Sequence, residues 1–313
     1  AFSGAIGLIV LQYPQGFFAF GASSIHLRTN AANEKSCEGN MEIGLSTASY
    51  FNKLQIEDAV LDIAQHQVPL CEVFLNTYSE YEPEFVALLD ERLRAGNVSV
   101  FSVHPMSMQF EPQLFSVHPR QRADAWRVFE QVLAGGQLLG ASHYVMHGPA
   151  RLFGGVKNIH LTRIAPIFTD LIQLAKAYGI QLTLENVSWC VFNEPEYGLR
   201  LLDAIGTDDV RFTLDVKQAV RSGFDPIDFI QAVGERIVNV HLCDATTMEN
   251  GAVRYDMPGF GKYDFGKMFH TLSEYGYKGP AFIEVYSDMY EEIPTLYESR
   301  ARMQRIVKDS PLR

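Results

Sequence analysis

The sequence predicts an α/β protein, a closed (β/α)8 barrel formed as a single domain with an N-terminal extension. From Met41 onward, short β-rich apolar runs alternate with longer amphipathic runs, which is typical of parallel strands joined by crossover helices. Eight such units fit a barrel domain of about 250 residues. The segment after the first predicted strand, ASYFNK, contains no glycine-rich phosphate-binding motif, which argues against an open nucleotide-binding sheet.

The predicted strands are short and separated by helical patterns. They span residues 42–47, 70–76, 98–104, 143–148, 181–187, 210–216, 237–244 and 281–286. Between residues 164 and 178, apolar side chains recur every three or four positions, which predicts one buried helix face, and Gly179 stands where a C-terminal cap is expected. Pro195 and Pro226 stand near predicted helix starts, where the missing N–H costs no hydrogen bond.

The composition is that of a large folded protein. The chain has 313 residues, of which 47% are hydrophobic and 20% charged. These values exclude a disordered chain, a collagen-like chain and a small disulfide scaffold. The net charge of −11 and the lack of a basic run disfavour nucleic acid and anionic membranes as main partners. Cys37, Cys71, Cys190 and Cys243 form no CxxC pair, so we expect reduced thiols and a cytoplasmic location.

Residues 1–40 differ from the rest of the chain. Residues 1–27 contain no Asp, Glu, Lys or Arg, but Gln12, Pro14, Gln15 and Gly16 interrupt the apolar stretch. The uninterrupted part is therefore shorter than the roughly 20 residues of a spanning helix, and a signal peptide should begin with positive charge. We interpret residues 1–40 as a non-catalytic extension or linker and residues 41–313 as the barrel. A fragmentary leader and upstream sequence without a folded role are the alternatives.

Four successive predicted strands carry one ionisable residue each, at the same phase near the strand end: Glu185, Asp215, His241 and Glu284. Barrel enzymes place their chemistry at the carboxyl ends of the strands. A buried carboxylate must be paired or metal-bound, because desolvating it alone costs several kcal/mol. Three carboxylates and one imidazole suit Mn²⁺, Mg²⁺ or Co²⁺, with Zn²⁺ as an alternative. A single residue of this kind commonly has only a structural role, so the prediction depends on finding one at the same phase on four successive strands.

The segments LENV, FTLDVKQAV, VHLCDA, PGFGKYDF and IEVY resemble the xylose-isomerase-like TIM barrels. That superfamily includes sugar and sugar phosphate isomerases and epimerases, inosose dehydratases and AP-endonuclease-type DNA repair enzymes. The resemblance covers about residues 41–290. The four ionisable residues are separated by 30, 26 and 43 residues. This spacing is similar to that of ketose 3-epimerases, apart from a longer last loop. It implies that these four residues bind one divalent metal. It also implies that Glu185 and Glu284 are catalytic and move protons through a metal-stabilised enediolate.

The resemblance also implies substrate-binding residues. His104 and His147 end the third and fourth predicted strands, where sugar enzymes of the superfamily contact substrate and repair enzymes bind metal. Arg254, in the segment after the seventh strand, would contact substrate hydroxyls, with a solvated loop cation as the alternative. Lys217 could reach substrate oxygens, with a surface salt bridge as the alternative.

The sequence departs from part of the superfamily. Gln218 stands where many epimerases and the repair enzymes have a histidine; it can hydrogen-bond a substrate hydroxyl but is a poor zinc ligand. The segment Asp256-Met257-Pro258 lacks the histidine that repair enzymes use after the seventh strand. With the net charge of −11, these departures make an AP endonuclease a poor hypothesis. Asp244, three residues after His241, is expected to orient its loop or the histidine itself.

We therefore hypothesise a divalent-metal-dependent isomerase or epimerase of a sugar, sugar phosphate or polyol. An inosose-dehydratase-type lyase would use the same metal and base, and a non-catalytic sugar-binding barrel is a further alternative because a fold does not determine a function. The expected partner is a small-molecule sugar or polyol, without nucleic acid or membrane. A homo-oligomer is compatible with the sequence.

Overall fold

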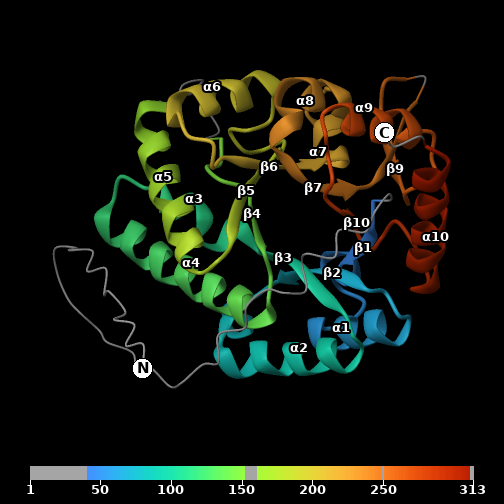
Figure 1. Cartoon of the computed structure of the whole chain (residues 1–313), viewed down its shortest axis with the longest axis horizontal. Helices are drawn as coiled ribbons and strands as arrows, with labels where there is room; N and C mark the ends of the chain where they lie inside the picture. Colours follow the sequence, from blue (N-terminus) through green and yellow to red (C-terminus); the bar gives the residue numbers. More distant parts are fainter. Residues whose placement is uncertain (1–40, 152–160, 249, 311–313) are drawn as a thin grey trace, which may run out of the picture. The chain divides into compact units, whose positions relative to one another are not determined.

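The computed structural model describes residues 41–151, 161–248 and 250–310. Within these residues, eight strands close into a barrel in the order β1-β10-β7-β6-β5-β4-β3-β2, and every neighbouring pair is parallel. Figure 1 shows the helices arranged around the outside of the strands. The predicted (β/α)8 TIM barrel is confirmed. The predicted extension over residues 1–40 lies outside the described residues.

The barrel strands all lie within or next to the predicted runs. They are β1 (Ile43–Ser46), β2 (Leu70–Leu75), β3 (Ser99–Pro105), β4 (His143–Met146), β5 (Gln181–Glu185), β6 (Arg211–Asp215), β7 (Ile237–Leu242) and β10 (Ala281–Ile283). The α-helices are α1 (Ile56–Gln65), α2 (Pro83–Ala95), α3 (Glu111–Leu114), α4 (Pro119–Leu139), α5 (Leu161–Ala177), α6 (Pro195–Ile205), α7 (Val216–Arg221), α8 (Pro226–Val233), α9 (Phe265–Glu274) and α10 (Pro294–Asp309). Short 3-10 helices are η1 (Thr47–Tyr50), η2 (Tyr78–Tyr81), η3 (Ser107–Gln109) and η4 (Gly234–Arg236).

The helix boundaries follow the local signals in the sequence. Pro195 and Pro226 are the first residues of α6 and α8, as predicted. Asp225 and Asp228 form a reciprocal capping box at the start of α8, which satisfies backbone N–H groups that the first turn leaves free. Gly179 has a φ of +73° just beyond the end of α5, a conformation that glycine adopts without steric cost. No helix in the described part of the chain is long and apolar enough to cross a membrane.

A hairpin after β7 differs from the prediction. The strand predicted over residues 237–244 ends at Leu242, and Asp244 begins a separate strand, β8 (Asp244–Thr247), which pairs antiparallel with β9 (Val253–Asp256). The short run DATT lacks the apolar alternation that identifies a strand, so the sequence did not reveal it. The hairpin places the predicted substrate residue Arg254 on β9, opposite Thr246.

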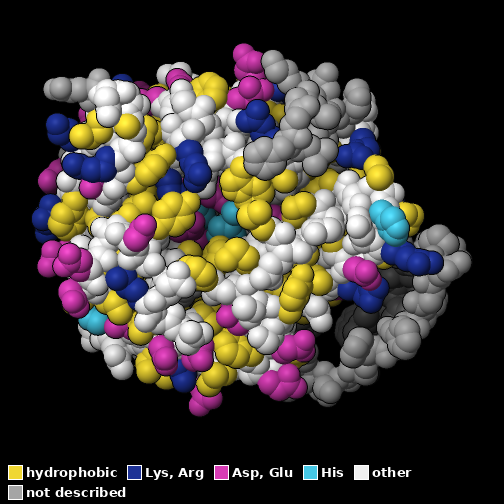
Figure 2. Space-filling model, turned by 180° about the vertical axis from the view of Figure 1, so that it is seen from behind, with side chains coloured by type: hydrophobic (Ala, Val, Ile, Leu, Met, Phe, Trp, Pro, Cys, Tyr) yellow, Lys and Arg dark blue, Asp and Glu magenta, His cyan; other side chains and the backbone are white. Residues whose placement is uncertain are grey.

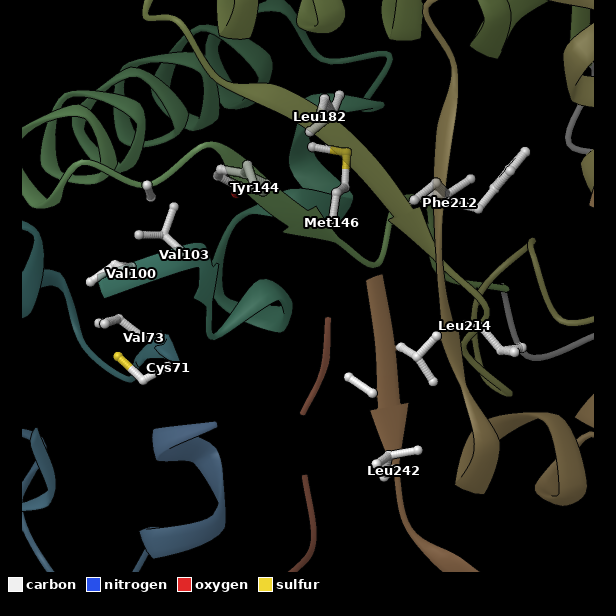
Figure 3. Close-up of a cluster of buried hydrophobic side chains, with 14 of the residues drawn as sticks. Cys71, Val73, Val100, Val103, Tyr144, Met146, Leu182, Phe212, Leu214 and Leu242 are labelled. Carbon is white, nitrogen blue, oxygen red and sulfur yellow. The ribbon is translucent and has the colours of Figure 1, made fainter. Parts of the chain in front are cut away.

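The two sides of the barrel strands are chemically different. Apolar side chains such as Val73, Val103 and Leu214 belong to the buried core shown in Figure 3. Many of the alternate positions carry buried polar side chains, among them Glu72, Ser102 and Asn239. There Thr183 and Thr213 hydrogen-bond each other at 2.8 Å between their hydroxyl oxygens. The barrel interior is thus a polar layer beneath the ends of the strands rather than a purely apolar core.

Candidate active site

The four predicted metal ligands meet at the carboxyl end of the barrel. Glu185 and Asp215 are the last residues of β5 and β6, and Asp215 pairs with His241 in the β6–β7 ladder. Glu284 directly follows β10, and its N–H donates to the carbonyl of Leu242 over 3.1 Å. The parallel register therefore brings one ionisable side chain from each of four neighbouring strands to the same level.

One buried atom of each side chain has no hydrogen bond. His241 Nδ1 lies 3.0 Å from Glu284 Oε2, 3.3 Å from Glu185 Oε1 and 3.9 Å from Asp215 Oδ2. All the candidate ligand atoms lie within 4.8 Å of one another. The buried atoms without a hydrogen bond are Glu185 Oε2, Asp215 Oδ2, His241 Nδ1 and Glu284 Oε2. Leaving a buried polar atom unsatisfied costs about 1–3 kcal/mol, so this arrangement fits a bound cation that these atoms share.

The Asp215 carboxylate is fixed from two sides. Its Oδ1 accepts the N–H of Gln218 at 2.6 Å as the cap of α7, which leaves Oδ2 for the cluster. The Asn186 side chain clamps the backbone of Asp215, accepting its N–H at 2.7 Å and donating to its carbonyl at 2.9 Å. The Gln218 side-chain oxygen accepts from the N–H and the hydroxyl of Ser188. Gln218, predicted to contact substrate, thus also ties α7 to the segment after β5.

Lys217 is buried next to the cluster. Its Nζ lies 3.8 Å from Asp215 Oδ2 and 4.3 Å from the centre of the Tyr286 ring. The surface salt bridge considered as its alternative is wrong, because only 3% of Lys217 is exposed. Burial by itself would lower the pKa of Lys217, but the Asp215 and Glu284 carboxylates outweigh burial and raise it. The side chain therefore adds a fixed positive charge at the edge of the site.

His104 and His147 lie together beside Glu185. Their Nε2 atoms are 2.9 Å apart, and His147 Nε2 is also 2.9 Å from Glu185 Oε2, without hydrogen-bond geometry in this second contact. The hydroxyl of Ser107 hydrogen-bonds His147 Nδ1, and the Trp189 ring meets the His147 ring edge-on. His147 is the partly exposed one of the pair, with 16% of its side chain accessible against 1% for His104.

Two buried carboxylates near these residues, Glu111 and Glu72, were not predicted from the sequence. Glu111, in α3, accepts the Tyr144 hydroxyl at 3.0 Å and the N–H groups of His147 and Gly148 at 2.9 and 3.3 Å. It holds the turn after β4 and so positions His147. No pattern in the segment EPQL marks this role. Glu72, by contrast, had a visible signal, because it is a carboxylate in the middle of the apolar strand LCEVFL.

Glu72 lies beneath the cluster inside the barrel and is fully buried. Its Oε2 is 3.1 Å from His241 Nε2, and its Oε1 is 3.5 Å from His104 Nδ1. The hydroxyls of Ser46 and Ser102 donate to it at 3.0 and 2.7 Å. Glu72 therefore links β1 and β3, which carry the two serines, to the predicted ligand His241 on β7.

Burial and crowding shift the ionisation of these groups. Burial alone would raise the pKa of Glu185, but the His147 and His241 imidazoles outweigh it and hold that pKa well below its usual value. Burial raises the pKa of Asp215 to about 7; Lys217 opposes this rise, and Glu185 adds to it. Positive charge on the neighbouring histidines and on Lys217 therefore stabilises the ionised carboxylates. A divalent cation at the same place would supply that charge instead.

The remaining predicted residues lie on or near the β8–β9 hairpin. Arg254 has 56% of its side chain exposed and forms an ion pair with Asp256 at 2.9 Å, rather than with any of the predicted ligands. Asp244 accepts three backbone N–H groups, from Gly259, Gly261 and Tyr263, at 3.0–3.1 Å. Of the two expectations for Asp244, orienting its loop is the one that the structure shows.

The site opens to one face of the protein. Figure 2 shows His and acidic atoms at the bottom of a depression in the middle of that face, surrounded largely by hydrophobic side chains. Three carboxylates and one imidazole are the ligand types that Mn²⁺, Mg²⁺, Co²⁺ and Zn²⁺ accept. A divalent metal could therefore be held by Glu185, Asp215, His241 and Glu284, within reach of a small molecule in this depression.

The fold and the site define a class of protein, a (β/α)8 barrel with a polar cluster at the carboxyl ends of its strands. The chain belongs to the xylose isomerase-like TIM barrel family, whose sequence pattern matches residues 61–306. This match confirms the resemblance seen in the sequence.

Individual relatives are more distant. The chain is 25% identical over 132 residues to an inosose isomerase of Halalkalibacterium halodurans, a match covering 41% of this chain and 47% of that protein, about half its length. The structure is similar to a D-tagatose 3-epimerase-like protein, with a TM-score of 0.72, 20% identity and coverage of 86% and 97% of the two chains. It is equally similar to an IolI protein with a bound zinc atom, with a TM-score of 0.72, 17% identity and coverage of 86% and 99%. At these identities the two structures support the shared fold alone.

Proposed function

We propose that the protein is a divalent-metal-dependent isomerase or epimerase of a small sugar or polyol. The main support is the set of four buried atoms without hydrogen bonds, one each from Glu185, Asp215, His241 and Glu284. These residues would hold the metal. The relatives named as inosose isomerase and D-tagatose 3-epimerase-like protein support the substrate class, and the zinc in the IolI protein supports the metal.

The residues of this site can carry out a proton transfer next to a carbonyl group. A bound divalent cation would polarise the carbonyl and so acidify the neighbouring C–H. Glu185 and Glu284 are the two proposed bases: one takes the proton from the carbon beside the carbonyl, and the same or the other carboxylate returns a proton. Return to the opposite face of the same carbon gives an epimer, and transfer between neighbouring carbons gives an isomer. His147, Lys217, Gln218 and Arg254 are proposed to bind substrate oxygens, with His104 supporting His147.

The test is deuterium exchange. The protein is loaded with Mn²⁺, Mg²⁺, Co²⁺ or Zn²⁺ in turn and incubated with D-tagatose, D-allulose or inosose in D₂O. The proposal expects a stoichiometric bound metal and deuterium at a carbon beside the carbonyl, detected by NMR and mass spectrometry. A product that has lost one water would identify a lyase of the inosose-dehydratase type instead. Tight sugar binding without turnover under any metal would identify a non-catalytic barrel.

Two variants test the roles of the carboxylates. Glu284→Gln keeps the shape of the side chain but cannot accept a proton, so we expect exchange to fall by about 10²–10⁴-fold. Glu235→Gln is the control, because Glu235 is exposed in η4, just before β7 begins at the other end of the barrel. A folded Glu284→Gln protein with wild-type exchange would exclude Glu284 as a base.

A further inference from the structure

We propose that Glu72 is a positioning residue that keeps the hydrogen of neutral His241 on Nε2, so that Nδ1 is free to bind the metal. The inference rests on the metal site proposed above. Nothing in the sequence pattern of the four strand-end residues points to Glu72, which lies 169 residues before His241 in the chain.

The His241 ring has two chemically distinct sides. Its Nε2 faces Glu72 Oε2 at 3.1 Å, whereas its Nδ1 faces Glu284 Oε2 at 3.0 Å and Glu185 Oε1 at 3.3 Å. Nδ1 makes no hydrogen bond. The ring therefore stands between one carboxylate below it and the candidate metal ligands above it.

The position of the proton follows from the acceptor below the ring. A carboxylate only accepts hydrogen bonds, so Nε2 must carry the hydrogen in the contact with Glu72. The Asn239 side-chain nitrogen, which can only donate, lies 3.2 Å from Nε2 and 3.3 Å from Glu72 Oε2. Once Nε2 carries a hydrogen it cannot accept, so the amide and the imidazole then both donate to Glu72 Oε2. With the hydrogen on Nε2, the lone pair of neutral His241 is on Nδ1 and points toward the other carboxylates. That is the tautomer a metal ligand requires.

The position of Glu72 in the barrel limits it to acting through its neighbours. It is fully buried, and the Ser46 and Ser102 hydroxyls from β1 and β3 fix its two oxygens. A substrate in the depression cannot contact a carboxylate beneath the ligand layer. Its effect on chemistry therefore passes through His241, and through His104, whose Nδ1 is 3.5 Å away.

Replacing Glu72 by glutamine changes the proton preference at almost constant shape. An amide nitrogen placed against His241 Nε2 donates a hydrogen bond, which favours the tautomer with hydrogen on Nδ1. That hydrogen would occupy the direction in which a metal binds. Loss of an outer hydrogen-bond partner of a metal-binding histidine typically costs about 10–100-fold in metal affinity, and we expect Glu72→Gln to fall in this range.

The experiment measures Co²⁺ affinity of the full chain by competition with a chelator. Wild type is compared with Glu72→Gln, with Glu72→Asp and with the control Glu80→Gln. The control replaces another buried carboxylate, which accepts the N–H of Asn76 and belongs to none of the candidate ligand groups. We expect Glu80→Gln to stay within about twofold of wild type, and Glu72→Asp, which keeps the charge, to lie between wild type and Glu72→Gln.

A second readout reports the tautomer directly. In ¹⁵N-histidine spectra of the zinc-loaded protein, the proposal expects His241 to be protonated on Nε2 and metal-bound on Nδ1, with its signals identified by their loss in His241→Asn. In the metal-free Glu72→Gln protein, measured at a pH high enough for the His241 ring to be neutral, the protonated nitrogen should change to Nδ1. A purely structural role for Glu72 would lower stability without moving this proton.

The outcomes separate the two proposals. If wild type binds no metal, both the metal site and the role of Glu72 are wrong. If wild type binds Co²⁺ and folded Glu72→Gln binds it equally well, only the role of Glu72 is wrong. If Glu72→Gln does not fold, Ser102→Ala replaces it. That variant removes the 2.7 Å hydrogen bond to Glu72 Oε2 and should weaken Co²⁺ binding by about threefold or more, so wild-type affinity there overturns the inference.

Discussion

Replacing Asp244 by alanine should release the segment 257–263 from the β8–β9 hairpin. The carboxylate accepts the N–H groups of Gly259, Gly261 and Tyr263 at 3.1, 3.0 and 3.0 Å. A hydrogen bond to a charged group contributes roughly 1.5–3 kcal/mol, so three of them set an upper range of roughly 4.5–9 kcal/mol. Because the three donor residues are only partly buried, water can replace some of these bonds. We therefore expect the free energy of unfolding to fall by about 3–5 kcal/mol.

Urea denaturation followed by circular dichroism measures this loss. Asp256→Ala is the matched control, because Asp256 lies on the same hairpin and pairs with the exposed Arg254, a contact worth at most about 1 kcal/mol. Hydrogen exchange of the Gly259, Gly261 and Tyr263 amides shows whether the segment opens locally. An Asp244→Ala protein within about 1 kcal/mol of wild type, with unchanged protection of these amides, would refute the reasoning.

A second variant examines the same contact from the other side. A Cβ atom added at Gly261 would collide with the Asp244 carboxylate. Gly261→Ala should therefore be destabilising in the presence of Asp244. The two substitutions should be non-additive, because each disrupts the same set of bonds.

Two further outcomes follow from buried groups elsewhere. Burial lowers the pKa of His143 to about 4, and Arg211 contributes to the lowering. Below about pH 6.5 the unfolded chain takes up a proton that the folded protein does not, so this group should remove about 3 kcal/mol of stability between pH 6.5 and 4. His143→Gln should flatten that part of the pH profile measured by urea denaturation, and equal slopes in both proteins would contradict the assignment. Mn²⁺ or Co²⁺ at 100 times its dissociation constant should raise the free energy of unfolding by about 2.7 kcal/mol, and EDTA should reverse the gain. Asp215→Asn should abolish this metal-dependent increment in thermal denaturation, and an increment of wild-type size would argue against Asp215 as a ligand.

The barrel strands were predictable because their signal is local. Short apolar runs and helix caps depend on neighbouring residues, and the strand ends at Glu185 and Asp215 agree with the prediction to within two residues. The β8–β9 hairpin was missed because its stability depends on contacts made after β7 is in place. Asp244 illustrates this, since its three donors lie 15–19 residues later in the chain.

The sequence by itself determined the fold class and the four residues that stand at equal phase on successive strands, because strand periodicity fixes which side chains share a face. The tertiary structure alone decided what surrounds those residues. Closing the barrel places Glu72 of β2 against His241 of β7, although these strands are not neighbours in the sheet. It also buries Lys217, which the sequence left open as a surface residue. Such contacts join groups that are distant in the chain, and only the closed geometry of the barrel sets their distance and burial.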